Sequence, residues 1–115
     1  MKKYTVQTKG FRIVKFEDNG VFHERMKNFD SHSIECTNHT FFRLSEKQKK
    51  ELTCDVLKNS LLNDIPLKVG IQANGNYAVY YKYAGNTVLK IVISVKPVLI
   101  RTVTFTILNK EQLPR

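Results

Sequence analysis

Residues 69–95 read VGIQANGNYAVYYKYAGNTVLKIVISV, and this stretch decides the fold class. Its apolar residues tend to recur at every second position, which is typical of strands that bury one face. An Asn-Gly pair at 74–75 is the strongest short hairpin signal, and an Ala-Gly-Asn sequence at 84–86 predicts a second turn. Another alternating run, VLIRTVTFTIL, occupies 98–108. Because consecutive strands are usually neighbours, the chain from Leu67 onward predicts a four-stranded antiparallel meander.

One face of this meander is predicted to be apolar, and the segment before it predicts the helix that covers it. The apolar face consists of Val79, Tyr81, Leu89, Ile91, Ile93, Val95, Val103, Phe105 and Ile107. Upstream, Ser45 to Gln48 fit a helix capping box. The apolar stripe that follows is Leu52, Val56, Leu57 and Leu61. We therefore expect a helix over 46–61 that packs on the apolar face of the sheet.

The N-terminal part predicts smaller elements. Residues 2–16 alternate weakly and predict one or two short strands, and residues 17–20 predict a turn. Residues 21–29 predict a short helix with Phe22, Met26 and Phe29 on one side, whereas the polar segment 30–40 predicts a loop or broken helix. The whole chain, residues 1–115, is thus expected to be one α+β domain. It would have N-terminal strands, a short helix, and one longer helix on the meander.

The composition is strongly basic, with 19 Lys and Arg against 10 Asp and Glu and a net charge of +9. The basic residues are spread along the chain, which favours a charged face on a folded domain that meets a polyanion. No run approaches the roughly 18–20 apolar residues of a membrane span, and no apolar stretch follows the N-terminal lysines. These features predict a cytoplasmic protein that makes no membrane contact, with Cys36 and Cys54 as free thiols.

The second face of the meander is predicted to be its wet face. Alternation assigns to it Tyr80, Lys82, Lys90, Ser94, Thr102, Thr104 and Thr106. Lysines interleaved with rings and hydroxyls suit RNA, because amines meet phosphates and rings stack on unpaired bases. The same residue types are also ordinary on the solvated face of an antiparallel sheet.

Three constellations bear on catalysis. His32, Cys36, His39 and Cys54 are zinc-type ligands, but their spacing matches no standard zinc finger, so we expect neither a metal nor another cofactor. A cysteine hydrolase lacks support, because no nucleophile elbow or phosphate loop is present. Metal-free RNA cleavage needs a base, a cation and an acid, for which the candidates are His23, Arg25, Arg101 and Tyr80. The candidates for binding RNA or a partner protein are Lys27, Lys82, Lys90, Thr102 and Thr104.

The order of the predicted elements and two local stretches resemble a known family. HERMKNFDSHSI at 23–34 and the paired final strands look like the RelE/ParE-type toxins and their barnase- and colicin-like relatives, over residues 20–108. The resemblance implies a metal-independent endoribonuclease that acts on mRNA or the ribosome and pairs with an antitoxin. Two departures weaken the catalytic part. The family histidine would fall at Val21, so that His23 substitutes only by a local shift, and the linker between the helices is extended.

A second hypothesis is a non-catalytic inhibitor or adaptor from a phage or mobile element, for example an anti-CRISPR protein. A third is a plain RNA-binding module. The expected partner is accordingly RNA or an acidic protein, either an antitoxin or a nucleic-acid enzyme. Expression in a host separates the first two hypotheses, because a toxin arrests growth when its antitoxin is missing.

Overall fold

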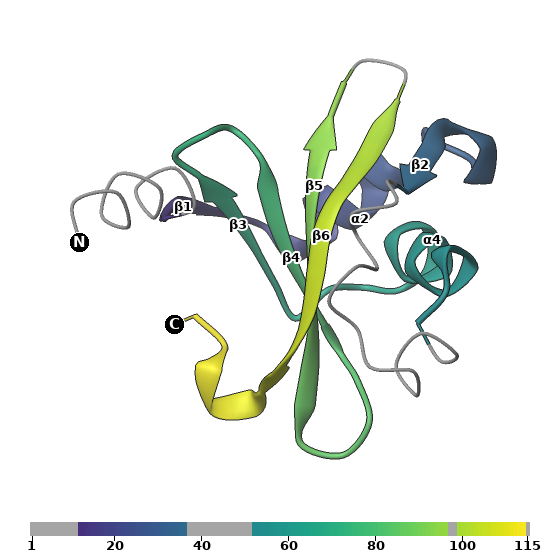
Figure 1. Ribbon diagram of the computed structural model, residues 1–115. Coiled ribbons are helices and arrows are strands. Elements are labelled where there is room, and N and C mark those ends of the chain that lie inside the picture. The colour runs from purple at the N-terminus through teal and green to yellow at the C-terminus, as the bar shows by residue number, and fades with distance from the viewer. Residues whose placement is uncertain (1–11, 37–51, 97–98, 115) are drawn as a thin grey trace, which may run out of the picture.

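The computed structural model describes residues 12–36, 52–96 and 99–114, and these residues form an α+β fold (Figure 1). Within them, one mixed sheet of six strands has the order β1-β3-β4-β5-β6-β2. The strands are β1 (Ile13–Glu17), β2 (Ile34–Cys36), β3 (Lys68–Gln72), β4 (Tyr77–Lys82), β5 (Thr87–Val95) and β6 (Ile100–Asn109). The helices are α2 (Asn19–Met26) and α4 (Cys54–Asn63), with short 3-10 turns at η1 (Ser31–Ser33) and η3 (Lys110–Gln112).

The predicted meander is present, but it is the middle of a larger sheet. Strands β3 to β6 pair antiparallel in sequence order, as expected. The turns between the first three of these strands contain Gly75 and Gly85 in the left-handed region that glycine favours, at φ 89° and 61°. At one edge β1 adds antiparallel to β3, and at the other β2 adds parallel to β6. The description as four strands under one helix was therefore too simple.

Helix α2 begins earlier than predicted and helix α4 begins later, because side-chain caps set their first residues. Asp18 accepts a hydrogen bond from the Val21 N–H, so the expected turn at 17–20 is the end of β1 followed by the first turn of α2. Thr53 is extended and caps α4 through the Val56 N–H. A continuous helix over 46–61 is therefore wrong, and the capping box at 45–48 lies outside the described residues.

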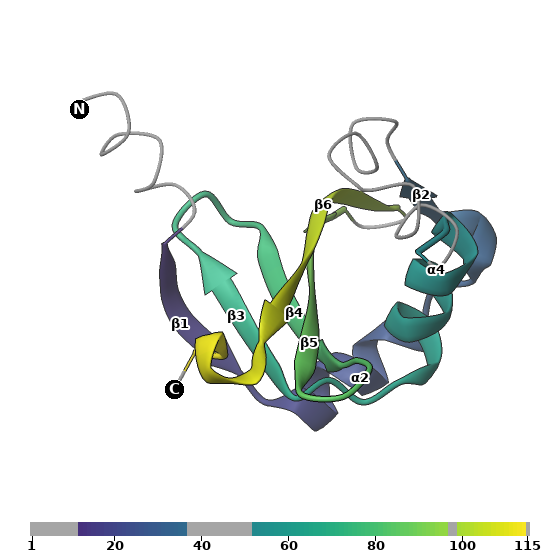
Figure 2. The same ribbon diagram turned by 60° about the horizontal axis from the view of Figure 1, so that its bottom comes forward.

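The predicted core face is confirmed. Val79, Tyr81, Leu89, Ile91, Ile93 and Phe105 are buried together with Phe22 and Met26 of α2 and with Leu57 and Leu61 of α4. Phe29, Val95 and Ile107 pack against this cluster. Figure 2 shows both helices on the same side of the sheet. Val56 departs from the prediction, because its side chain is exposed.

A bulge in β6 overturns the predicted position of Thr102. Val92 pairs with Thr104, whereas the next residue, Ile93, pairs with Thr102. The extra residue, Val103, reverses the alternation, since each side chain beyond it points to the opposite face. Thr102 therefore shares the core face with Ile93 and is fully buried, instead of lying on the wet face. The side chains of Val103 and Thr104 lie outside what the structure describes.

The expectation of free thiols is also wrong, because Cys36 and Cys54 form a disulfide with Cα atoms 6.0 Å apart. The bond joins the last residue of β2 to the first residue of α4. Strand β2 itself was not predicted, since three residues are too few to display a period. With both sulfurs in the disulfide, neither cysteine can bind zinc as a thiolate together with His32 and His39. His39 itself lies outside the described residues. None of the described helices is long and apolar enough to cross a membrane.

Candidate anion-binding site

The predicted catalytic residues lie on two sides of the sheet. His23, Arg25 and Lys27 belong to α2 or follow it, and α2 packs on the core face. Tyr80 belongs to a separate cluster on the opposite face, which we call the second face. The sheet therefore separates His23 and Arg25 from Tyr80.

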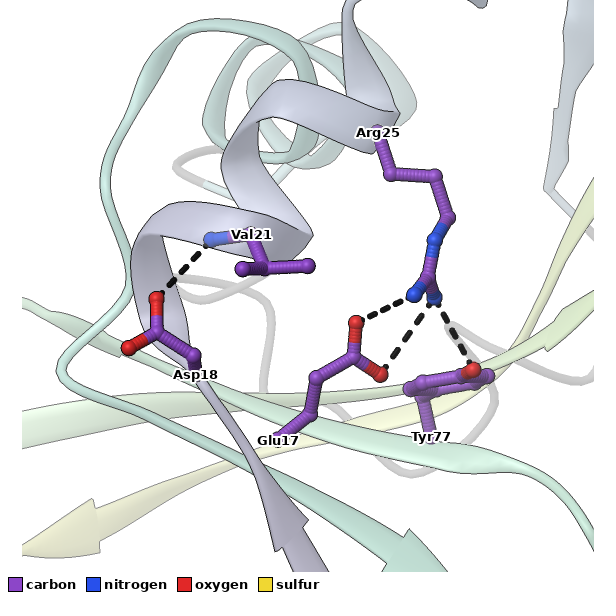
Figure 3. A network of polar contacts seen from close by, with 5 residues as sticks. All are labelled: Glu17, Asp18, Val21, Arg25 and Tyr77. Atoms are coloured by element: carbon purple, nitrogen blue, oxygen red, sulfur yellow. Dashed lines mark hydrogen bonds and ion pairs between the residues drawn. The ribbon is translucent and has the colours of Figure 1, made fainter.

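Arg25 is part of a structural clasp (Figure 3). Its guanidinium contacts both carboxylate oxygens of Glu17 at the end of β1, and it donates to the hydroxyl of Tyr77 on β4 at 3.0 Å. Burial works against the charged guanidinium, but Glu17 and Tyr77 outweigh it and raise the pKa of Arg25. The Glu17 side chain is only 13% exposed, so the ion pair is largely shielded from water and holds α2 to the sheet. Because Arg25 is engaged in this pair, it is poorly placed to bind a phosphate.

The remaining predicted residues, of which the bulge places Arg101 opposite Ser94 on the second face, are also engaged or unsupported. Lys27 pairs with Glu24, and Arg101 pairs with Glu35 across β6 and β2, each at 3.0 Å. His23 buries its Nδ1, which finds no hydrogen-bond partner among the described residues. A catalytic histidine needs a group that orients its ring, and this histidine has none in the described chain.

Four residues line up across the second face, and we call them the lysine row. The strand register places Lys68, Tyr80, Lys90 and Thr106 directly opposite one another on β3, β4, β5 and β6. Directly opposed side chains lie about 5 Å apart and on the same face. On β1, Phe16 pairs with Gly70 and is thus diagonal to Lys68, at the end of the row.

Aromatic rings hold both lysines of the row. The Nζ of Lys90 lies 5.8 Å from the ring centroid of Tyr80, and the Nζ of Lys68 lies 4.8 Å from that of Phe16. Each lysine thus leans over the neighbouring strand on the β1 side. Such contacts are worth about 0.5–1 kcal/mol at exposed sites. They restrict the two side chains before any ligand arrives.

The second face is less open than predicted. Tyr80 is only 2% exposed and packs with Ala78, Val88 and Val92. Leu113, beyond η3, packs on the same cluster. Burial raises the pKa of Tyr80 and lowers that of Lys90. The expected part of Tyr80 in catalysis or base stacking is therefore not supported, because its side chain is covered.

Lys82 and Lys90 are diagonal neighbours rather than an opposed pair. Lys82 pairs with Val88, and Lys90 pairs with Tyr80. The sequence interpretation missed Lys68, although it lies one residue before the alternating run. A two-residue Asn-Gly turn at 74–75 would have placed Lys68 opposite Tyr81, whereas the observed register places it opposite Tyr80 and thus in line with Lys90.

The three lysines of the second face differ in their ion pairing from the other basic residues that the sequence singled out. Arg25, Lys27 and Arg101 each pair with a glutamate. In contrast, no carboxylate of the described chain forms an ion pair with Lys68, Lys82 or Lys90. The described residues also contain no group of three or more metal-ligand side chains. The second face therefore presents three positive charges without an internal counterion, which suits a ligand with several negative charges.

Comparisons with protein families, curated proteins and solved structures give no match for this chain. The resemblance to the RelE/ParE-type toxins therefore stays a prediction.

Proposed function

We propose that this protein is a small RNA-directed protein that binds the phosphate backbone on its second face and does not cleave it. One observation carries the proposal. Lys68, Lys82 and Lys90 lie close together on one face of the sheet, and none of them forms an ion pair with a carboxylate of the described chain. The resemblance to RNA-directed toxins supports RNA as the polyanion, and the proposal assumes the cytoplasm as the compartment.

The spacing of the lysines favours a chain of phosphates over one small anion. Neighbouring strands lie about 4.8 Å apart, so the Cα atoms of Lys68 and Lys90 are separated by roughly 10 Å. Lys82 lies two residues along β4 from the row, a further ~7 Å. Three amines spread over this area match successive phosphates. The rings under Lys68 and Lys90 reduce the rotamer freedom that binding would otherwise remove.

Burial of Lys90 adds to the case. Desolvation disfavours its charged form and lowers its pKa, because no carboxylate compensates. A bound phosphate would supply the missing negative charge and raise the pKa again. An anion therefore gains more at Lys90 than at a fully solvated lysine.

Cleavage has less support than binding. The ribonuclease hypothesis needs a base, a cation and an acid around one phosphate. His23 and Arg25 lie on the helix side, Arg25 is clasped by Glu17, and Tyr80 is buried on the other side. We therefore expect total RNA and tRNA to stay intact with pure protein. Cleavage that disappears in His23→Ala would overturn this part of the proposal.

The binding proposal is tested by removing the three lysines of the second face together. In Lys68→Ala/Lys82→Ala/Lys90→Ala, we expect weaker binding of a labelled single-stranded RNA. The slope of log K against log salt should fall by about 0.7 for each lost phosphate contact, hence by up to about 2. Fluorescence anisotropy over a series of salt concentrations measures both quantities, and circular dichroism checks the fold.

A matched control removes the same charge elsewhere. Lys15→Ala/Lys27→Ala/Lys58→Ala removes the same charge outside the second face, since Lys15 pairs with Ile71 and the other two lysines lie on or directly after the helices. We expect this control to keep most of the slope. Equal losses in both triple variants would mean that RNA responds only to net charge, and the second face would then not be the site.

A further inference from the structure

Phe16 is an exposed ring at the end of the lysine row. Its side chain is on the edge strand β1 and is 44% exposed. The residue opposite it on β3 is Gly70, which offers no side chain to cover it. Single exposed apolar residues are common on protein surfaces, so the feature that matters at Phe16 is an accessible aromatic ring beside the lysine row.

The sequence assigned base stacking to the wrong ring. Tyr80 lies in the middle of the row but is only 2% exposed, so no base reaches it. Phe16 lies next to Lys68, whose Nζ is 4.8 Å from the ring centroid. The ammonium of Lys68 lies over one face of the Phe16 ring, so a base that stacks on the other face has its phosphate within reach of the lysine row.

We propose that the second face takes single-stranded RNA, with the backbone along the lysine row and an unpaired base stacked on Phe16. This inference rests on the proposed function and specifies its ligand. Bases of a duplex are already stacked and paired inside the helix, so they cannot stack on a ring at the protein surface. Bases of a single strand are free to do so, and stacking on aromatic side chains is their usual mode of recognition.

The dimensions suit a short oligonucleotide. From Phe16 on β1 to Thr106 on β6, the ring and the row together span four strand spacings, or about 19 Å. A single-stranded probe of ~10 nucleotides therefore covers the row and the ring, within the range of site sizes that sheet surfaces of comparable width occupy. An adenosine decamer is the probe of choice, since adenine stacks well, and an RNA hairpin of equal charge is its comparison.

Phe16→Ala tests the stacking directly. We expect the decamer to bind about 5- to 150-fold more weakly, which is the loss of one stacked base. The salt slope should not change, because no charge is removed. Affinity for the hairpin should also stay as in the wild type. Val14→Ala is the matched control, since Val14 is an exposed apolar residue of the same strand, and it should bind like the wild type.

Phe16→Trp gives a second and independent readout. The chain contains no tryptophan, so the new indole would be the only one. We expect its fluorescence to be quenched by the decamer at saturation and much less by the hairpin. This variant keeps an aromatic platform and should retain wild-type affinity.

Failure of this inference is distinguishable from failure of the proposed function. If Phe16→Ala binds the decamer like the wild type, or if the tryptophan of Phe16→Trp is not quenched at saturation, the stacking proposal is overturned. Binding of the RNA backbone is tested separately by the triple lysine variant. Equal binding of hairpin and decamer overturns the preference for single strands. Polyglutamate that binds as tightly as the decamer would point to an acidic protein partner and overturn the assignment to RNA.

Discussion

Replacing Ile91 with aspartate is expected to unfold the protein. Ile91 is fully buried in the centre of the sheet, where it pairs with Val79 on one side and Phe105 on the other. The substitution removes an apolar side chain from the core and places a carboxylate there without a partner. Burial of an unpaired charge costs several kcal/mol, which is a large part of the roughly 5–15 kcal/mol that stabilises a typical domain.

The measurement is a thermal or urea melt followed by circular dichroism. Two variants at related positions bracket the result. Ile91→Val should lower stability by about 1 kcal/mol, because it removes only one buried methyl group. Ser94→Asp changes the same strand outside the buried cluster and should melt close to the wild type. Native-like melting of Ile91→Asp would contradict the assignment of the core face.

Removal of the disulfide is expected to have the next largest effect. The bond between Cys36 and Cys54 closes a loop with a sequence separation of 18 residues. Restricting the unfolded chain with a loop of this length is worth about 3 kcal/mol in the chain-entropy model. Cys36→Ser/Cys54→Ser should therefore unfold at a distinctly lower urea concentration than the oxidised wild type.

The loss should begin at one edge of the sheet. Strand β2 has only three residues paired with β6, supported by the Glu35–Arg101 ion pair, whose side chains are both about half exposed. Exposed pairs of this kind contribute little, so β2 is held mainly by the disulfide and by Ile34, which is buried in the core. Hydrogen exchange in the double variant should therefore rise first at 34–36, while β4 and β5 stay protected.

Reductant provides the control for this experiment. Wild-type protein in dithiothreitol should match the double serine variant, and the reductant should not affect that variant. Reaction of both cysteines with a thiol reagent in untreated native protein would contradict the disulfide. Disulfides are rare in the reducing cytoplasm. If this protein works there, its cysteines are expected to be reduced, and β2 is then held less firmly than in the oxidised form.

The sequence by itself determined the elements whose signals are local. Alternation and two glycine turns specify β3, β4 and β5, because a strand displays its buried face within a few residues and a left-handed turn needs glycine. The spacing of Phe22 and Met26 likewise predicted the face of α2 that is buried. Capping by Asp18 and Thr53 is also local, yet a turn-like Asn-Gly pair and a stronger upstream capping box concealed it.

Only the tertiary structure decided which cations remain unpaired. The lysine and tyrosine alternation was visible in the sequence, but the neutralising partners were not. Glu17 lies 8 residues from Arg25, and Glu35 lies 66 residues from Arg101. The pairing of Cys36 with Cys54, the parallel addition of β2 and the bulge at Val103 are equally non-local. Such contacts depend on how distant segments meet in the folded sheet. The hydrophobic periodicity of the sequence, at 2.0 or 3.6 residues, carries no information about which distant segments meet.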